Sequence, residues 1–76
     1  MNANHLLPAN IVLEKYPEIN YAVVMRNTPV SHKFVAAYGI HDNDPDDIYW
    51  DQGHYFESLV DCIHYIDQKL YENGMR

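Results

Sequence analysis

Cysteine is nearly absent from this chain of 76 residues, which contains Cys62 alone. An intrachain disulfide is therefore excluded, and a single thiol in a small chain favours a reducing compartment. The longest purely apolar runs have about four residues, far fewer than the roughly 20 that span a bilayer. Residues 1–7 have no positive side chain and no long apolar run, so we expect no signal peptide there. These absences predict a cytoplasmic protein without a membrane partner.

Positive charge is also scarce. Five Lys and Arg residues stand against eleven Asp and Glu residues, which gives a formal net charge of −6. Residues 34–68 contain no Lys or Arg at all, although they hold eight of the eleven acids. Phosphate backbones are bound mainly by clustered Lys and Arg side chains. The chain is therefore not expected to bind nucleic acid or an anionic membrane directly.

The length suffices for one domain over 1–76, with residues 1–7 expected to be a flexible N-terminus. A domain of this size buries only about 60% of the surface that its unfolded chain exposes. Small domains usually gain stability from disulfides, a metal or a partner. Disulfides are excluded here, so a metal, a partner or a well-packed core remains.

The clearest local pattern predicts a C-terminal helix over 58–73. Its apolar residues recur at steps of three and four and would form one helical face; they are Leu59, Val60, Ile63, Ile66 and Leu70. Ser58 is placed as the N-cap, and Asp61 favours the positive end of the first turn. Gly74 suits a left-handed C-cap after Lys69.

Two runs rich in β-formers, 21–26 and 33–40, precede that helix. The segment between them contains Pro29 and reads as a turn, so the two runs predict an antiparallel hairpin. Side chains alternate along a strand, which predicts one shared face in the second run. The residues assigned to that face are Phe34, Ala36, Tyr38 and Ile40.

The segment 41–47 is predicted to be a loop, because five of its seven residues are Asp or Asn and Pro45 lacks an amide donor. A third strand is expected at 48–51. It would resume at 54–56 after a bend at Gly53.

At the N-terminal side, Pro8 is placed like the first residue of a helix, and Pro17 would end it. Ile11, Val12 and Tyr16 would form its short apolar stripe. The expected fold is therefore α+β: a small three-stranded antiparallel sheet, a C-terminal amphipathic helix packed on one of its faces, and a short N-terminal helix.

Asp42, Asp44 and Asp46 have the alternate spacing of the first ligands in a calcium loop. The Gly and Glu that would complete an EF-hand loop are replaced by Asp47 and Gly53. A solvated acidic turn is therefore the favoured interpretation of this segment.

His64 has Asp61 and Asp67 three residues away on either side of the same predicted helix. Such a trio could hold a metal or tune a proton transfer, but a solvated polar stripe is favoured. Cys62 adjoins the apolar helical face without a basic neighbour, which favours packing over nucleophilic chemistry. We expect no catalytic residue, no metal and no cofactor.

Aromatic side chains accompany the acids. The chain has seven tyrosines and one tryptophan, and such residues are enriched at energetically important interface positions. Acids around them would attract a basic partner and raise its association rate. The predicted partner-binding residues are Asp42, Asp44, Asp46, Asp47, Tyr49, Trp50, Asp51, Tyr55, Glu57 and Asp61.

These features predict a non-catalytic binding protein that docks on a basic surface of a larger protein. It would act as an inhibitor or modulator, as small phage-encoded inhibitors such as anti-CRISPR proteins do, and its carboxylates could imitate the phosphates of DNA. This comparison rests on size and charge. The alternatives are a structural module that self-associates, for example as a homodimer, and a small metal-binding protein or enzyme built on His64, Asp61 and the Asp-rich loop.

Overall fold

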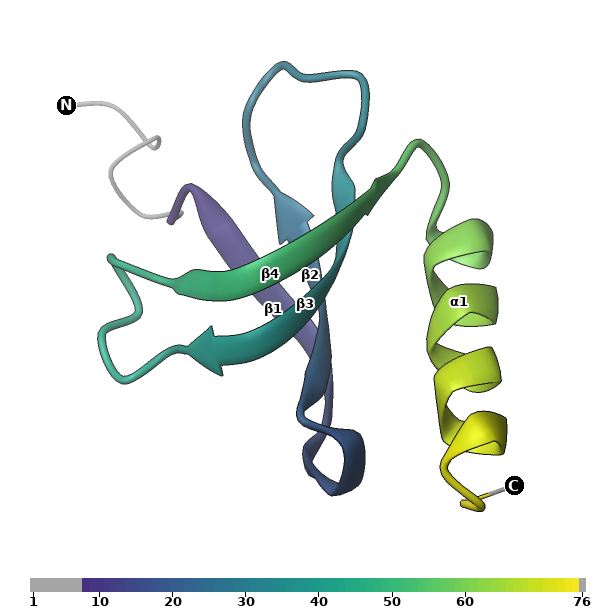
Figure 1. Cartoon of the computed structure of the whole chain (residues 1–76). Coiled ribbons are helices and arrows are strands. Elements are labelled where there is room, and N and C mark those ends of the chain that lie inside the picture. Colours follow the sequence, from purple (N-terminus) through teal and green to yellow (C-terminus); the bar gives the residue numbers. More distant parts are fainter. Residues whose placement is uncertain (1–7, 76) are drawn as a thin grey trace, which may run out of the picture.

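The structure is a computed structural model that describes residues 8–75, so the predicted flexible N-terminus at 1–7 lies outside the described residues. The described part contains one antiparallel sheet and one C-terminal α-helix, which confirms the α+β class (Figure 1). The strands pair in chain order, β1-β2-β3-β4, with every neighbouring pair antiparallel. The elements are β1 (Asn10–Tyr16), a 3₁₀ turn (Pro17–Ile19), β2 (Tyr21–Arg26), β3 (Phe34–His41), β4 (Tyr49–Phe56) and α1 (Leu59–Glu72).

The predicted N-terminal helix is wrong, because the segment forms β1 and gives the sheet four strands instead of three. β1 pairs with β2, from Asn10 opposite Arg26 to Tyr16 opposite Tyr21, with a register shift between Val12 and Glu14. Three apolar residues cannot stabilise an isolated helix of two turns. Pairing with β2 instead forms backbone hydrogen bonds along one side of the segment. Pro17 ends the strand by starting the 3₁₀ turn.

The predicted hairpin and loop are confirmed, while the third predicted strand is longer than expected. β2 and β3 pair antiparallel with Tyr21 opposite Tyr38. β4 runs without a break at Gly53, which lies opposite Ala37. A side chain at position 53 would collide with the indole of Trp50 and the side chain of Val35. Gly53 therefore allows close packing over the strand and does not interrupt its pairing with β3.

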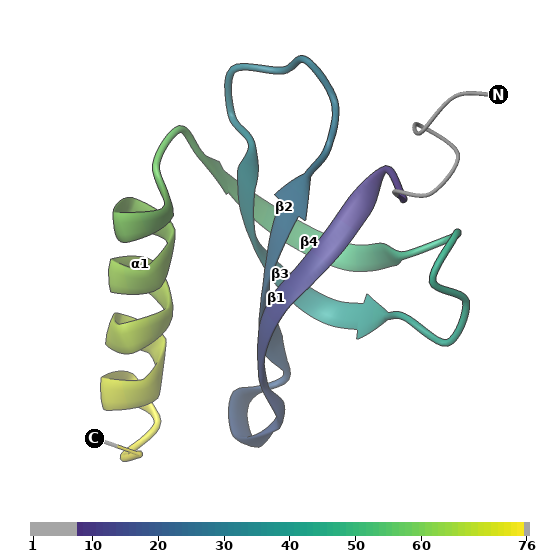
Figure 2. The same ribbon diagram turned by 180° about the vertical axis from the view of Figure 1, so that it is seen from behind.

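The predicted C-terminal helix is confirmed as α1. The Ser58 hydroxyl accepts a hydrogen bond from the Asp61 amide at 3.1 Å, as an N-cap does. Gly74 follows the helix with φ of 74°, in the left-handed region that a C-cap requires. Figure 2 shows from behind that α1 covers one side of the sheet.

The helix and this face of the sheet enclose the first of two apolar clusters. Cys62, Ile66 and Leu70 of α1 pack against Val23 of β2 and Ala36 of β3. All five side chains are buried. Ile66 and Leu70 of the predicted helical stripe are confirmed, but the prediction is wrong for Leu59 and Val60, which are exposed, and Cys62 takes the buried position in the first turns. Burying both apolar faces together is the main source of stability for such a two-layer arrangement.

The opposite face of the sheet encloses a second cluster although no described helix covers it. Ala22, Val24, Val35 and Ala37 are fully buried there, with Trp50 packed over them.

The sheet curls over this cluster, and β1 and β4 approach each other without pairing as strands. β1 and β4 are the outer strands of the sheet, yet they cross in the views of Figures 1 and 2. The Asn10 side-chain amide donates to the carbonyl oxygen of Ile48 at 3.0 Å, and Lys15 pairs with Asp42 at 2.6 Å. These contacts join the two sides of a strongly curled sheet, and the second cluster fills its concave face.

The predicted shared face of β3 fails at its last member. Phe34 and Ala36 lie on the helix side, but Ile40 packs with the concave cluster. Gly39 lies between them and has φ of 70°, in the left-handed region. A left-handed residue rotates the chain within a strand, so the alternation is reset after it. Ile40 and its cross-strand partner Trp50 consequently both point to the concave side.

We expect Gly39→Ala to lower the free energy of unfolding by at least about 1–2 kcal/mol, the cost of holding a left-handed backbone with a Cβ atom. The new methyl group would also meet the carboxylate of Asp51. Gly74→Ala is the matched control, because it has a similar φ and no atom within 4 Å of the new Cβ. Urea denaturation of both variants measures the difference. A loss for Gly39→Ala no greater than that for Gly74→Ala would show that the β3 twist does not depend on this glycine.

Candidate protein-interaction surface

The loop between β3 and β4 contains a tight turn, which the sequence itself explains. The Asp47 amide donates to the Asp44 carbonyl oxygen at 2.9 Å, which closes a four-residue turn with Pro45 in its second position. The Asp44 carboxylate also accepts a hydrogen bond from the Asp46 amide at 3.0 Å. Asp at the first position and Pro at the second are the residues that such a turn favours. The three carboxylates are therefore held on a defined turn.

Asp44, Asp46 and Asp47 are all exposed, and no cation within residues 8–75 forms an ion pair with them. Asp42 differs, because its carboxylate pairs with Lys15 at 2.6 Å and is only a quarter exposed. The turn thus presents three uncompensated negative charges to solvent, while Asp42 joins the loop to β1.

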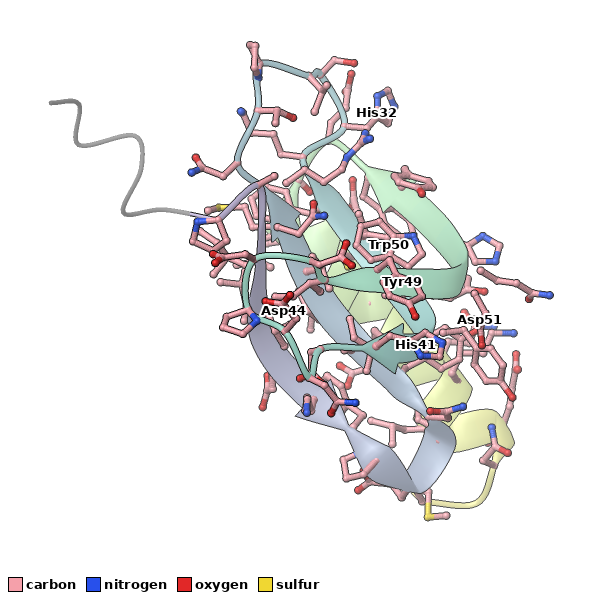
Figure 3. The ribbon with its side chains drawn as sticks, turned by 90° about the vertical axis from the view of Figure 1, so that its left-hand side faces the viewer. His32, His41, Asp44, Tyr49, Trp50 and Asp51 are labelled. Atoms are coloured by element: carbon pink, nitrogen blue, oxygen red, sulfur yellow. The ribbon has the colours of Figure 1, made fainter. Side chains whose placement is uncertain are left out.

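Three side chains at the neighbouring ends of β3 and β4 form a connected group, which Figure 3 labels. The rings of His41 and Tyr49 stack with centroids 4.5 Å apart and planes 9° from parallel. Nε2 of His41 lies 2.9 Å from a carboxylate oxygen of Asp51. Tyr49 remains 53% exposed, so its ring offers a large aromatic surface next to the acidic turn. His41 was not among the predicted partner-binding residues, and only its position opposite Tyr49 in the sheet identifies it.

Trp50 and Tyr55 contribute less to the outer surface than predicted from sequence alone. Trp50 is half-buried over the concave cluster, and its Nε1–H donates to the Tyr55 hydroxyl at 3.0 Å. The guanidinium of Arg26 lies 4.6 Å from the centre of the Tyr55 ring, a cation–π contact. The same guanidinium donates to the carbonyl oxygen of His32 at 2.6 Å. Arg26 therefore brings a positive charge to the aromatic pair, which local sequence could not reveal.

Glu57 and Asp61 lie at the other end of β4 from the acidic turn. The eight residues of β4 separate them from the turn, a path of at most roughly 26 Å at about 3.3 Å per residue. The structure thus divides the ten predicted residues into three groups: an acidic patch, the pair Trp50 and Tyr55, and the acids after β4. The acidic patch consists of Asp42, Asp44, Asp46, Asp47, Tyr49 and Asp51.

The other candidate sites have little geometric support. Among residues 8–75, no group of three or more His, Cys, Asp or Glu side chains is placed to hold a metal ion. Asp61 and His64 are exposed on α1. Cys62 is fully buried in the helix-side cluster, and burial raises the pKa of its thiol to about 11. A nucleophilic thiol needs the opposite shift, so the packing interpretation of Cys62 agrees with the structure.

No protein-family model, curated protein or solved structure matches this chain. In the part of the chain that the structure describes, no helix combines the length and the apolar character needed to cross a lipid bilayer.

Proposed function

We propose that this chain is a non-catalytic binding protein that docks its acidic patch on a basic surface of a larger protein. The observation that carries the proposal is the fixed turn with three exposed, uncompensated carboxylates beside the exposed ring of Tyr49. Bound in this way, the chain would act in the cytoplasm as an inhibitor or modulator of its partner. A nucleic-acid-handling protein is the proposed partner class, because its basic surface is built to receive phosphates.

Charge supports this proposal. The acidic patch has five aspartates, and one lysine, Lys15, pairs with one of them, Asp42. Such a concentration of one sign steers an oppositely charged partner and raises its association rate. Tyr49 adds a rigid aromatic surface with a polar hydroxyl, the type of residue that anchors many interfaces.

The test compares two variants with the same change in net charge. The first replaces Asp44, Asp46 and Asp47 by asparagine. The side-chain oxygen of an asparagine at position 44 can still accept from the amide of residue 46, so the turn is kept. The control replaces Glu14, Glu18 and Glu72 by glutamine; all three are exposed and lie outside the acidic patch. Each protein is immobilised and exposed to a lysate of the source cell, and the retained proteins are identified.

We expect a basic partner that the wild type and the control retain, and that the turn variant binds at least about tenfold more weakly. Raising the salt concentration from about 0.05 to 0.3 M should weaken capture by the wild type, because salt screens exposed charges. Double-stranded DNA should compete if the partner handles nucleic acid. Equal capture by the turn variant and the wild type would refute docking through the acidic patch.

A further inference from the structure

The outer edge of β4 is an open strand edge. β4 pairs along one side with β3, from His41 opposite Tyr49 to Phe34 opposite Phe56. No other segment within residues 8–75 pairs with its second side. The row of backbone N–H and C=O groups on that side is free to bind an additional strand.

The two outer strands of the sheet differ in how their edges are protected. β1 has a register shift between Val12 and Glu14 and has the charged side chains of Glu14 and Lys15, features that discourage pairing with another strand. β4 is eight residues long, has no proline or lysine, and pairs with β3 without a register shift. Apart from His54, Asp51 is the only acidic or basic residue of the strand. β4 is therefore the edge that favours strand addition.

Charges around β4 determine what kind of strand can bind there. The turn acids Asp44, Asp46 and Asp47 precede the strand, Asp51 lies within it, and Glu57 and Asp61 follow it. Arg26 contacts the strand at the Tyr55 ring, where it adds one positive charge against these six acids. An antiparallel second copy would place the acidic turn of one chain beside Glu57 and Asp61 of the other, and a parallel copy would place like acids side by side. Both arrangements bring negative charges together, so a second copy of this chain is disfavoured.

We propose that β4 receives an extended basic segment of the partner protein, which adds to the sheet as a fifth strand. This inference rests on the proposed function and specifies the mode of docking. Backbone hydrogen bonds to β4 would supply affinity, and Lys or Arg side chains near Asp51 and near the two ends of the strand would supply selectivity. Exposed Tyr49 would contact side chains of the added strand.

Two synthetic peptides of equal charge test the role of the strand edge. The first is an octapeptide of alternating Lys and Val, which can form a β-strand, and the second alternates Lys and Pro. Proline has no N–H group, so the second peptide cannot complete a ladder of hydrogen bonds. We expect the Lys–Val peptide to bind the full chain at least about tenfold more tightly. Isotope-detected NMR should show slowed amide exchange along β4 on its addition.

A substitution that reverses a charge on β4 provides a second test of the strand-addition mode. Asp51→Lys places a lysine in the middle of the open edge, so affinity for the Lys–Val peptide should fall at least about tenfold. Glu18→Lys makes the same change in charge on an exposed residue outside β4 and should have a smaller effect. Equal binding of the two peptides, or a dimer of the free chain joined through β4 in sedimentation and NMR experiments, would overturn the strand-addition mode.

The outcomes separate this inference from the proposed function. If both peptides bind equally and the lysate partner still depends on the turn acids, docking is by charge alone and the strand-addition mode is wrong. If capture of the partner is also independent of the turn acids, both proposals are wrong.

Discussion

Ile66→Ala is expected to lower the free energy of unfolding by about 2–5 kcal/mol, the usual cost of truncating a large buried aliphatic side chain. Ile66 is fully buried in the centre of the cluster that joins α1 to the sheet. The loss combines the transfer of the missing methyl and methylene groups with the cavity that they leave. A small domain has a total stability of only about 5–15 kcal/mol, so this single change would remove a large part of it.

Urea denaturation followed by circular dichroism measures this loss. Val60→Ala is the control, because Val60 lies on the same helix and is 60% exposed. Its truncation should change the free energy of unfolding by no more than about 0.5 kcal/mol, as for most surface substitutions. Similar effects of the two substitutions would contradict the packing of α1 on the sheet.

Alkaline pH is expected to destabilise the domain, with the first loss caused by Cys62. Burial raises the pKa of this thiol from 9.0 to about 11 in the folded chain. Below pH 9 the thiol is protonated in both states, and its contribution to stability is fully present. Between pH 9 and 11 only the unfolded chain loses the proton, so stability falls as pH rises. A shift of this size corresponds to about 2–3 kcal/mol at 1.36 kcal/mol per pH unit.

Tyr21 is expected to lower the free energy of unfolding further at higher pH. Its pKa is raised from 10.0 to about 12, mainly by burial and further by a hydrogen bond with Tyr65. Urea titrations at pH 8, 9.5 and 11, chosen around these pKa values, measure the slope. Cys62→Ala should abolish the fall in stability between pH 9 and 10 and reduce it between pH 10 and 11, where the contribution of Tyr21 remains. The same fall in the variant and in the wild type would show that Cys62 does not cause it.

The parts of the fold that could be predicted from sequence are those specified by neighbouring residues. The helix α1 is an example, since Ser58 and Gly74 mark its start and its end within 17 residues, and Ile66 and Leu70 mark the C-terminal half of its buried face. The turn at Pro45 is another, because Asp44 and Pro45 favour it locally. β1 could not be predicted in this way, because its four apolar residues, Ile11, Val12, Leu13 and Tyr16, fit either a helix or a strand. Only the pairing with β2 decides between them.

In the candidate surface, too, local features could be predicted from sequence and contacts between distant segments could not. The acids of the turn are exposed, as their density in the sequence indicates. Their relation to Glu57 and Asp61 depends on the course of β4, which is one continuous strand through Gly53 where sequence patterns predicted two shorter runs separated by a bend. The pairing of Asp42 with Lys15 and the contact of Arg26 with Tyr55 both join distant segments. Only the curvature of the sheet creates such contacts.

The single tryptophan gives the chain an intrinsic fluorescence signal from one known position. Trp50 lies on the concave face at the start of β4, with its indole N–H bonded to Tyr55 and away from the cluster under α1. Its fluorescence emission should therefore change when water enters the concave cluster or when a partner binds to β4. Changes confined to the helix side would leave it largely unaltered. Intrinsic fluorescence and far-ultraviolet dichroism would then follow the two layers of the domain separately, without an added dye.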